Sequence, residues 1–126
     1  MSSKIAIQTS KAPAAIGPYS QAIRVNGFVY TSGQLGLDPE TGELKAGVQE
    51  QTHQAFKNIQ AILEEEGLNL NHIIKTTVFL NDMNDFTAVN EVYATYFTDS
   101  FPARSAVEVA RLPKDGLVEI EAIAVV

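Results

Sequence analysis

The chain contains no cysteine among its 126 residues, so it can form no disulfide, no thiolate metal site and no cysteine nucleophile. Basic residues are also few, because nine Lys and Arg stand against fifteen Asp and Glu, which gives a net charge of −6. A protein that binds nucleic acid through the phosphate backbone requires clustered Lys and Arg. The charge balance therefore argues against a nucleic-acid partner.

Long apolar runs are absent too, and the first residues lack the apolar core of a signal peptide. We therefore expect a cytoplasmic protein without a membrane partner. Apolar residues make up 45% of the chain, and no linker, repeat or low-complexity tract interrupts it. This composition is typical of one globular domain, which we expect over residues 1–126.

The common catalytic motifs are missing as well. The sequence has no G-x-S-x-G elbow, no P-loop, no G-x-G-x-x-G and no H-E-x-x-H. Its two histidines, His53 and His72, have no His, Cys or Asp at ligand spacing, and we interpret both as plain surface residues. Any chemistry must therefore come from a less familiar set of side chains.

Apolar periodicity predicts two kinds of element. Asn26-Gly27 is the preferred pair for a two-residue type I′ turn, so residues 22–33 should form a hairpin. Apolar residues at three- and four-residue steps predict helices over 47–67 and 85–97. Further strands are expected at 5–9, 73–80, 105–110 and 117–126.

The resulting order, β-β-β-α-β-α-β-β, favours an α+β fold with a mixed β-sheet and two helices packed on one face. We expect the last two strands to be joined as a hairpin through residues 111–116. The segment 119–126 has few polar residues. We therefore expect the chain to self-associate, so that another copy covers the other face of the sheet.

Arg104 stands at the mouth of an otherwise apolar strand. The residues after it, Ser105 and Ala106, are small, so backbone N–H groups beside Arg104 are open to a ligand. A guanidinium presents a planar set of donors that suits a carboxylate bidentately. Two interpretations stay open: Arg104 pairs with a surface acid of the protein, or it binds an anionic ligand.

Glu119 and Glu121 share one face of the last strand. Both could be solvated surface residues, but a carboxylate in such an apolar strand could also act as a general base or orient water. In the expected hairpin Arg104 lies opposite Ala124 and Glu119 opposite Val109, which separates the two by roughly 16 Å. If both serve one site, they should therefore come from different subunits.

Tyr19 and Ser32 complete the candidates. Tyr19 ends a loop rich in proline and glycine, and Ser32 precedes Gly33, where backbone can approach a ligand. A core tyrosine and a strand-end serine are the alternative interpretations.

Four segments together resemble one known family. They are APAAIGPYSQA at 12–22, TSGQ at 31–34, KTTVFLNDMNDFTAVN at 75–90 and FPARSAVEVARLPKDGLVEIEAIAV at 101–125. These segments are similar to the RidA (YjgF, L-PSP) family of reactive intermediate deaminases, which act on enamines and imines. The resemblance covers nearly the whole chain. Part of this family has been described as translation inhibitors or endoribonucleases.

The resemblance implies a chorismate-mutase-like fold and a homotrimer with clefts between subunits. It also implies hydrolysis of 2-iminobutanoate and 2-iminopropanoate, which arise from enamines released by pyridoxal-phosphate dehydratases. The products are 2-oxo acids and ammonia, and the reaction needs no cofactor. The expected partners are thus a small imino or 2-oxo acid and further copies of the chain.

The resemblance also assigns the family's site residues: its carboxylate-binding arginine is Arg104, its glutamate Glu119, its tyrosine Tyr19, its serine-glycine pair Ser32 and Gly33, and its asparagine Asn90. Many relatives have cysteine where this chain has Ala106. That departure puts any thiol-dependent activity in doubt. Hydrolysis should be spared if only the backbone N–H at this position binds substrate, since the tetrahedral chemistry does not require a thiolate.

Two other functions remain open. A small 2-oxo acid binding module would use the Arg104 pocket without turnover. An endoribonuclease or translation inhibitor would bind RNA, but the net charge of −6 and the lack of a His/Lys catalytic cluster count against it.

Overall fold

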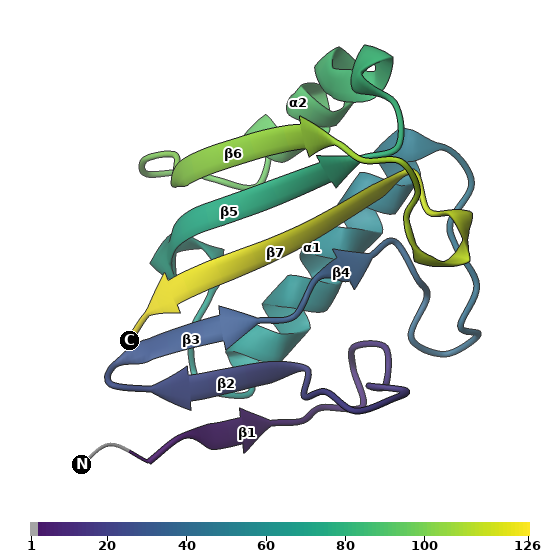
Figure 1. Cartoon of the computed structure of the whole chain (residues 1–126). Helices are drawn as coiled ribbons and strands as arrows, with labels where there is room; N and C mark the ends of the chain where they lie inside the picture. Colours follow the sequence, from purple (N-terminus) through teal and green to yellow (C-terminus); the bar gives the residue numbers. More distant parts are fainter. Residues whose placement is uncertain (1–2) are drawn as a thin grey trace.

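A computed structural model describes residues 3–126. The elements are β1 (Ile5–Ile7), β2 (Ala22–Val25), β3 (Phe28–Thr31), β4 (Gln34–Leu35), α1 (Val48–Glu64), β5 (Ile73–Leu80), α2 (Phe86–Ala94), β6 (Ala103–Glu108) and β7 (Val118–Val125). Both helices pack on one face of a single mixed sheet (Figure 1). The predicted α+β class is therefore confirmed. The sequence patterns do not predict β4, which is only two residues long.

The hairpin of β2 and β3 forms at the predicted turn. Asn26 and Gly27 have φ angles of 52° and 79°, and positive φ at both central residues is what a type I′ turn requires. The strands pair in antiparallel register from Val25 with Phe28 to Ala22 with Thr31.

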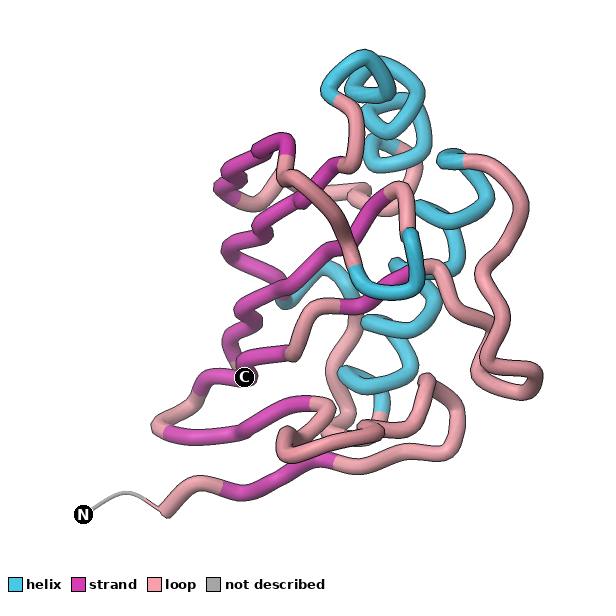
Figure 2. The backbone as a smooth tube through the Cα atoms, turned by 45° about the vertical axis from the view of Figure 1, so that its right-hand side comes forward, coloured by secondary structure: helices cyan, strands magenta, loops and turns pink. Residues whose placement is uncertain are grey.

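Helix α1 supplies most of the core beneath the sheet. Its apolar stripe includes Phe56, Ile59 and Ile62, which are completely buried. Figure 2 shows the helices and the strands as two layers. The helix ends as predicted near Gly67, whose φ of 73° suits glycine, and the Leu68 amide donates back to the Leu63 carbonyl. Burying each such side chain contributes about 1.5–3 kcal/mol to stability.

The predicted hairpin between the last two strands is wrong. The strand order is β1-β2-β3-β7-β5-β6, so β5 lies between β6 and β7. Strands β5 and β6 are parallel, and a parallel pair needs a crossover connection, which α2 supplies. Residues 111–116 therefore pass over the end of β5 on their way to β7, as Figure 1 shows.

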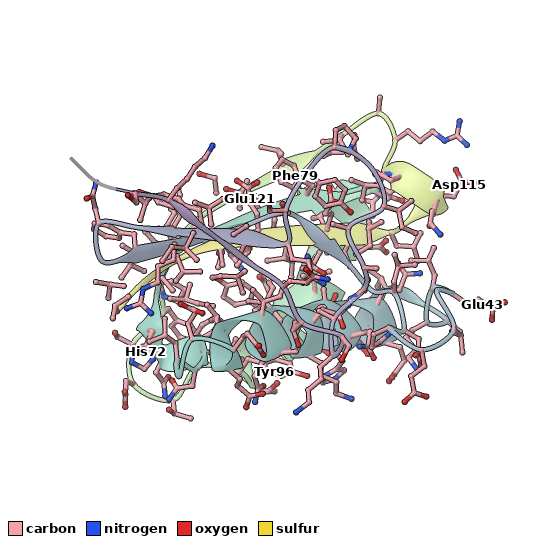
Figure 3. All side chains as sticks on the ribbon, turned by 90° about the horizontal axis from the view of Figure 1, so that it is seen from below. Glu43, His72, Phe79, Tyr96, Asp115 and Glu121 are labelled. Carbon is pink, nitrogen blue, oxygen red and sulfur yellow. The ribbon has the colours of Figure 1, made fainter. Side chains whose placement is uncertain are left out.

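The observed register also corrects the predicted positions of the two candidate residues. Arg104 is in register with Thr76 of β5, and Thr76 with Ala122 of β7, rather than Arg104 with Ala124. Thr76 and Ala122 are buried beneath the helices, so Arg104 faces the helical layer. Glu119 is in register with Phe79 on the opposite face. Figure 3 shows Phe79 and Glu121 on the side of the sheet away from α1.

Candidate functional site

The candidate site residues other than Ala106 line two separate cavities. The first, about 460 Å³, is lined by Asn90, Tyr93, Ala94, Phe101, Pro102 and Arg104. The second, about 830 Å³, is lined by residues that include Tyr19, Ser32, Gly33 and Glu119. Within one chain, Arg104 and Glu119 therefore point to opposite faces of the sheet and line different cavities.

Uncharged groups surround Arg104 in the first cavity. Its Nη1 donates to the Asn90 Oδ1 at 2.7 Å. The guanidinium carbon lies 5.2 Å from the ring centre of Phe86 and 4.7 Å from that of Tyr93. Within residues 3–126, no carboxylate forms a salt bridge with Arg104, so the surface acid that one interpretation requires does not occur there. The guanidinium keeps donors and its charge for a ligand.

The Ala106 amide lies at the open edge of the sheet. The Val109 amide, just beyond β6, donates to the Leu80 carbonyl of β5. Because successive amides along a strand alternate in direction, the Ala106 N–H points away from β5. Strand β6 is the last strand in the sheet order, so this N–H faces outward from the same strand that carries Arg104.

Glu119 lines the second cavity together with two other acidic residues, Asp38 and Glu40. Burial raises the pKa of its carboxyl above the ordinary value, and the charge of Glu121 on the same strand face raises this pKa further. A carboxyl with a raised pKa can take up and release a proton closer to neutral pH. Glu119 therefore has the properties of an acid/base group.

Gly33 provides the space that the Glu119 carboxyl occupies. A Cβ atom at position 33 would lie 2.9 Å from the Glu119 Cδ, which is closer than such atoms approach. The neighbouring Ser32 donates from its hydroxyl to the Ser20 carbonyl at 2.6 Å. Ser32 thus ties the loop that carries Tyr19 to the end of β3.

The Tyr19 loop is held by a buried residue that the sequence patterns do not single out. Gln21 is 3% exposed, and its amide oxygen accepts from the Thr9 N–H at 2.8 Å. Its amide nitrogen donates to the Thr9 and Pro13 carbonyls. Tyr19 itself is 53% exposed, so it is not a core tyrosine. A single glutamine before a strand is part of no periodic sequence pattern, so the sequence alone does not reveal this role.

Both histidines are partly exposed, and each ring forms a hydrogen bond that the sequence does not predict. His53 is half-buried, with its Nδ1 2.7 Å from the Tyr96 hydroxyl oxygen. His72 accepts a hydrogen bond from the Asn69 amide at 3.1 Å and so closes a short 3₁₀ turn. Neither histidine lines the two cavities described above.

Two other kinds of feature are absent from residues 3–126. No group of three or more His, Asp or Glu side chains in this range is placed to hold a metal ion. In the same range no helix has both the length and the apolar character needed to span a membrane.

Known proteins resemble this chain over nearly its full length. The sequence model of the family described as Endoribonuclease L-PSP matches residues 9–126. The 2-iminobutanoate/2-iminopropanoate deaminase of Mus musculus is 58% identical over 120 residues, which are 94% of this chain and 89% of the mouse protein.

Two solved structures match in fold as well. The crystal structure of RidA from an Antarctic Psychrobacter species has a TM-score of 0.94 at 52% identity, covering 97% of this chain and 99% of that one. The crystal structure of E. coli TdcF with bound serine has a TM-score of 0.93 at 48% identity, covering 97% and 98%. The chain therefore belongs to the Endoribonuclease L-PSP family, which is the RidA (YjgF) family that its sequence resembles.

Proposed function

We propose that the chain hydrolyses small 2-imino acids to 2-oxo acids and ammonia. The main support for this proposal is the environment of Arg104. Its guanidinium lines an open cavity and forms no salt bridge with an acidic residue within residues 3–126. The name of the mouse relative supports the same reaction. The serine bound to E. coli TdcF, an amino acid with a carboxylate, supports an anion-binding site in this family.

Arg104 and the Ala106 N–H bind the substrate carboxylate in this proposal. Charge-assisted hydrogen bonds of this kind contribute about 1.5–3 kcal/mol each. In a 2-imino acid the electrophilic carbon is bonded directly to the carboxylate carbon. Holding the carboxylate therefore holds the imine carbon in place for attack.

Glu119 then activates a water molecule, with Tyr19 as a hydroxyl partner for that water. As the water oxygen bonds to the carbon of the protonated imine, the Glu119 carboxylate takes one of its protons. Glu119 returns this proton to the nitrogen of the resulting carbinolamine. The C–N bond breaks, and the departing ammonia takes the proton of the remaining hydroxyl, so that the carbonyl forms and the nitrogen leaves as ammonium. Imines also hydrolyse unaided, so an acceleration of about 10²–10⁴-fold from positioning and one acid/base group suffices.

A second copy of the chain completes the site in this proposal. Arg104 and Glu119 line different cavities of one chain, so one substrate can meet both only if two chains contribute. The outer face of the sheet also leaves apolar side chains exposed, with Tyr30 at 43% and Val107 at 42%. We propose the homotrimer that the resemblance implies, with Asn90 and Ser32 lining the clefts between subunits.

Purified protein tests the reaction directly. An amino-acid oxidase generates 2-iminobutanoate in the assay, and semicarbazide competes for it. We expect the protein to suppress semicarbazone formation, and light scattering after gel filtration to give three times the chain mass. If the semicarbazone persists with several imino acids while 2-oxobutanoate still binds, the protein is a binding module. RNA cleavage that vanishes with a site substitution would instead favour the endoribonuclease.

Gly33→Ala should lower turnover about 10- to 100-fold, because the added Cβ displaces the Glu119 carboxyl from its position. The turnover number and the thermal midpoint should be measured for both proteins. The same substitution in a Glu119→Ala background is the control, since the effect should disappear when the displaced group is absent. An equal loss in both backgrounds would show that Gly33 acts in another way.

A further inference from the structure

Three residues of α2 surround the Arg104 guanidinium. Phe86, Asn90 and Tyr93 are four and three residues apart, so they form one stripe along the helix face toward β6. Asn90 accepts one N–H, and the rings of Phe86 and Tyr93 lie 5.2 Å and 4.7 Å from the guanidinium carbon. Both distances are within the range of cation–π attraction.

The Tyr93 ring is itself firmly held. Tyr93 is 4% exposed, and its hydroxyl oxygen lies 2.7 Å from the Thr76 Oγ1 of β5. The Phe56 ring of α1 contacts it edge to face at 5.3 Å between centres. Phe86 packs against the same core cluster. The rings therefore form a rigid support beneath a side chain that otherwise has many rotamers.

The chemistry of this support differs from that of an ion pair. A guanidinium has five N–H donors in its plane and two open faces. A carboxylate partner would neutralise the charge and occupy the in-plane donors. Aromatic rings hold the cation by its charge and consume no N–H. Within residues 3–126 the acceptor for an Arg104 N–H is Asn90, which is uncharged.

We propose that Phe86 and Tyr93 are positioning residues that hold the Arg104 guanidinium through their ring faces, so that its charge and remaining donors stay available for a substrate carboxylate. This inference rests on the proposed function of Arg104 in binding that carboxylate. It assigns a role in substrate affinity to two aromatic residues that the helical pattern places among the core residues.

Leucine at either position should weaken 2-oxobutanoate binding about 2- to 30-fold, the range expected for one cation–π contact. Calorimetry measures this affinity, and the semicarbazone assay measures kcat and KM, of which KM should change more. Tyr93→Phe should lose less affinity than Tyr93→Leu, since it keeps the ring and gives up only the hydroxyl contact with Thr76. Tyr96→Leu is the matched control, because Tyr96 stacks on Phe56 but does not contact Arg104.

A fluorinated series at position 86 separates the ring's electrons from its shape. Phenylalanine with one, two and three ring fluorines fills nearly the same space while the negative charge of the ring face falls. We expect the affinity for 2-oxobutanoate to fall stepwise along the series at an unchanged thermal midpoint. This series keeps the inference testable if the leucine variants do not fold.

Several results would overturn the inference. These are an affinity that is flat along the fluorine series, an equal loss in Tyr96→Leu, or a loss in Tyr93→Phe as large as in Tyr93→Leu. The two proposals also fail separately. Ring-dependent 2-oxobutanoate binding without imine hydrolysis would retain the aromatic support and remove the deaminase. Hydrolysis with a 2-oxobutanoate affinity that does not depend on the rings would retain the deaminase and remove the aromatic support. If the wild type binds no small carboxylate, both proposals are overturned.

Discussion

Arg104→Ala should reduce kcat/KM for 2-iminobutanoate about 10²–10⁴-fold, because about two charge-assisted hydrogen bonds to the substrate carboxylate are lost. The fold should survive, since β6 is an edge strand whose backbone pairing with β5 does not involve this side chain. The semicarbazone assay gives kcat/KM, and circular dichroism with gel filtration reports fold and assembly.

Arg24→Ala is the matched control for this loss. Arg24 forms a salt bridge with Glu66 at 2.9 Å and lines neither of the two site cavities. Its removal should change stability slightly and activity very little, since partly exposed ion pairs contribute about 1 kcal/mol or less. Arg104→Lys should be intermediate, because it keeps the charge and loses the planar arrangement of donors. Wild-type rates in a folded Arg104→Ala protein would remove Arg104 from the mechanism.

Glu119→Gln should reduce turnover about 10²–10⁴-fold, the usual contribution of a general acid/base group. Glu119→Gln should also have a higher free energy of unfolding than the wild type at neutral pH. Burial and the charge of Glu121 raise the pKa of Glu119 in the native state, so the folded protein favours the protonated carboxyl. Ionisation of Glu119 above its native pKa therefore destabilises the fold, and glutamine removes this effect.

The stability gained by Glu119→Gln should increase with pH. Below about 4.3, the pKa of glutamate in an unfolded chain, Glu119 is protonated in both states and the two proteins should melt alike. As the pH rises through the native pKa, the thermal midpoint of Glu119→Gln should move above that of the wild type. A gain that grows toward low pH would contradict the raised pKa, and unchanged turnover would make Glu119 a structural residue.

Glu121→Gln is the control for this second experiment. It removes the like charge beside Glu119, so the pKa of Glu119 should fall toward its ordinary value. The acid limb of the pH–rate profile should then move to lower pH while the maximal turnover is largely kept.

Local patterns in the sequence were sufficient to predict most elements. Helix α1 and the hairpin at Asn26-Gly27 depend on short-range rules of periodicity and turn geometry, and both occur where those rules place them. The pairing of the last strands is different, because sequential strands are usually neighbours and a hairpin was the default. The signal against it was the helix between residues 73–80 and 103–108, since a strand-helix-strand order favours a parallel pair.

The site shows the same division. Arg104 and Glu119 can be identified from the sequence as candidates because each is a charged residue in an apolar strand. Gln21 and the two aromatic residues beside Arg104 cannot, since their proposed roles rest on contacts between elements distant in sequence. The stripe of Phe86 and Tyr93 resembles that of any helix packed on a core.

The position of β7 in the sheet has a consequence for how the protein is made. Val118–Val125 follow all the other strands in sequence order, yet they lie between β3 and β5. A ribosome therefore delivers β1–β3 and the β5–α2–β6 unit before the strand that joins them. Until β7 emerges, β3 and β5 each present an unpaired edge that another chain could occupy. The two parts of the sheet can therefore join only after β7 is available to pair with both edges.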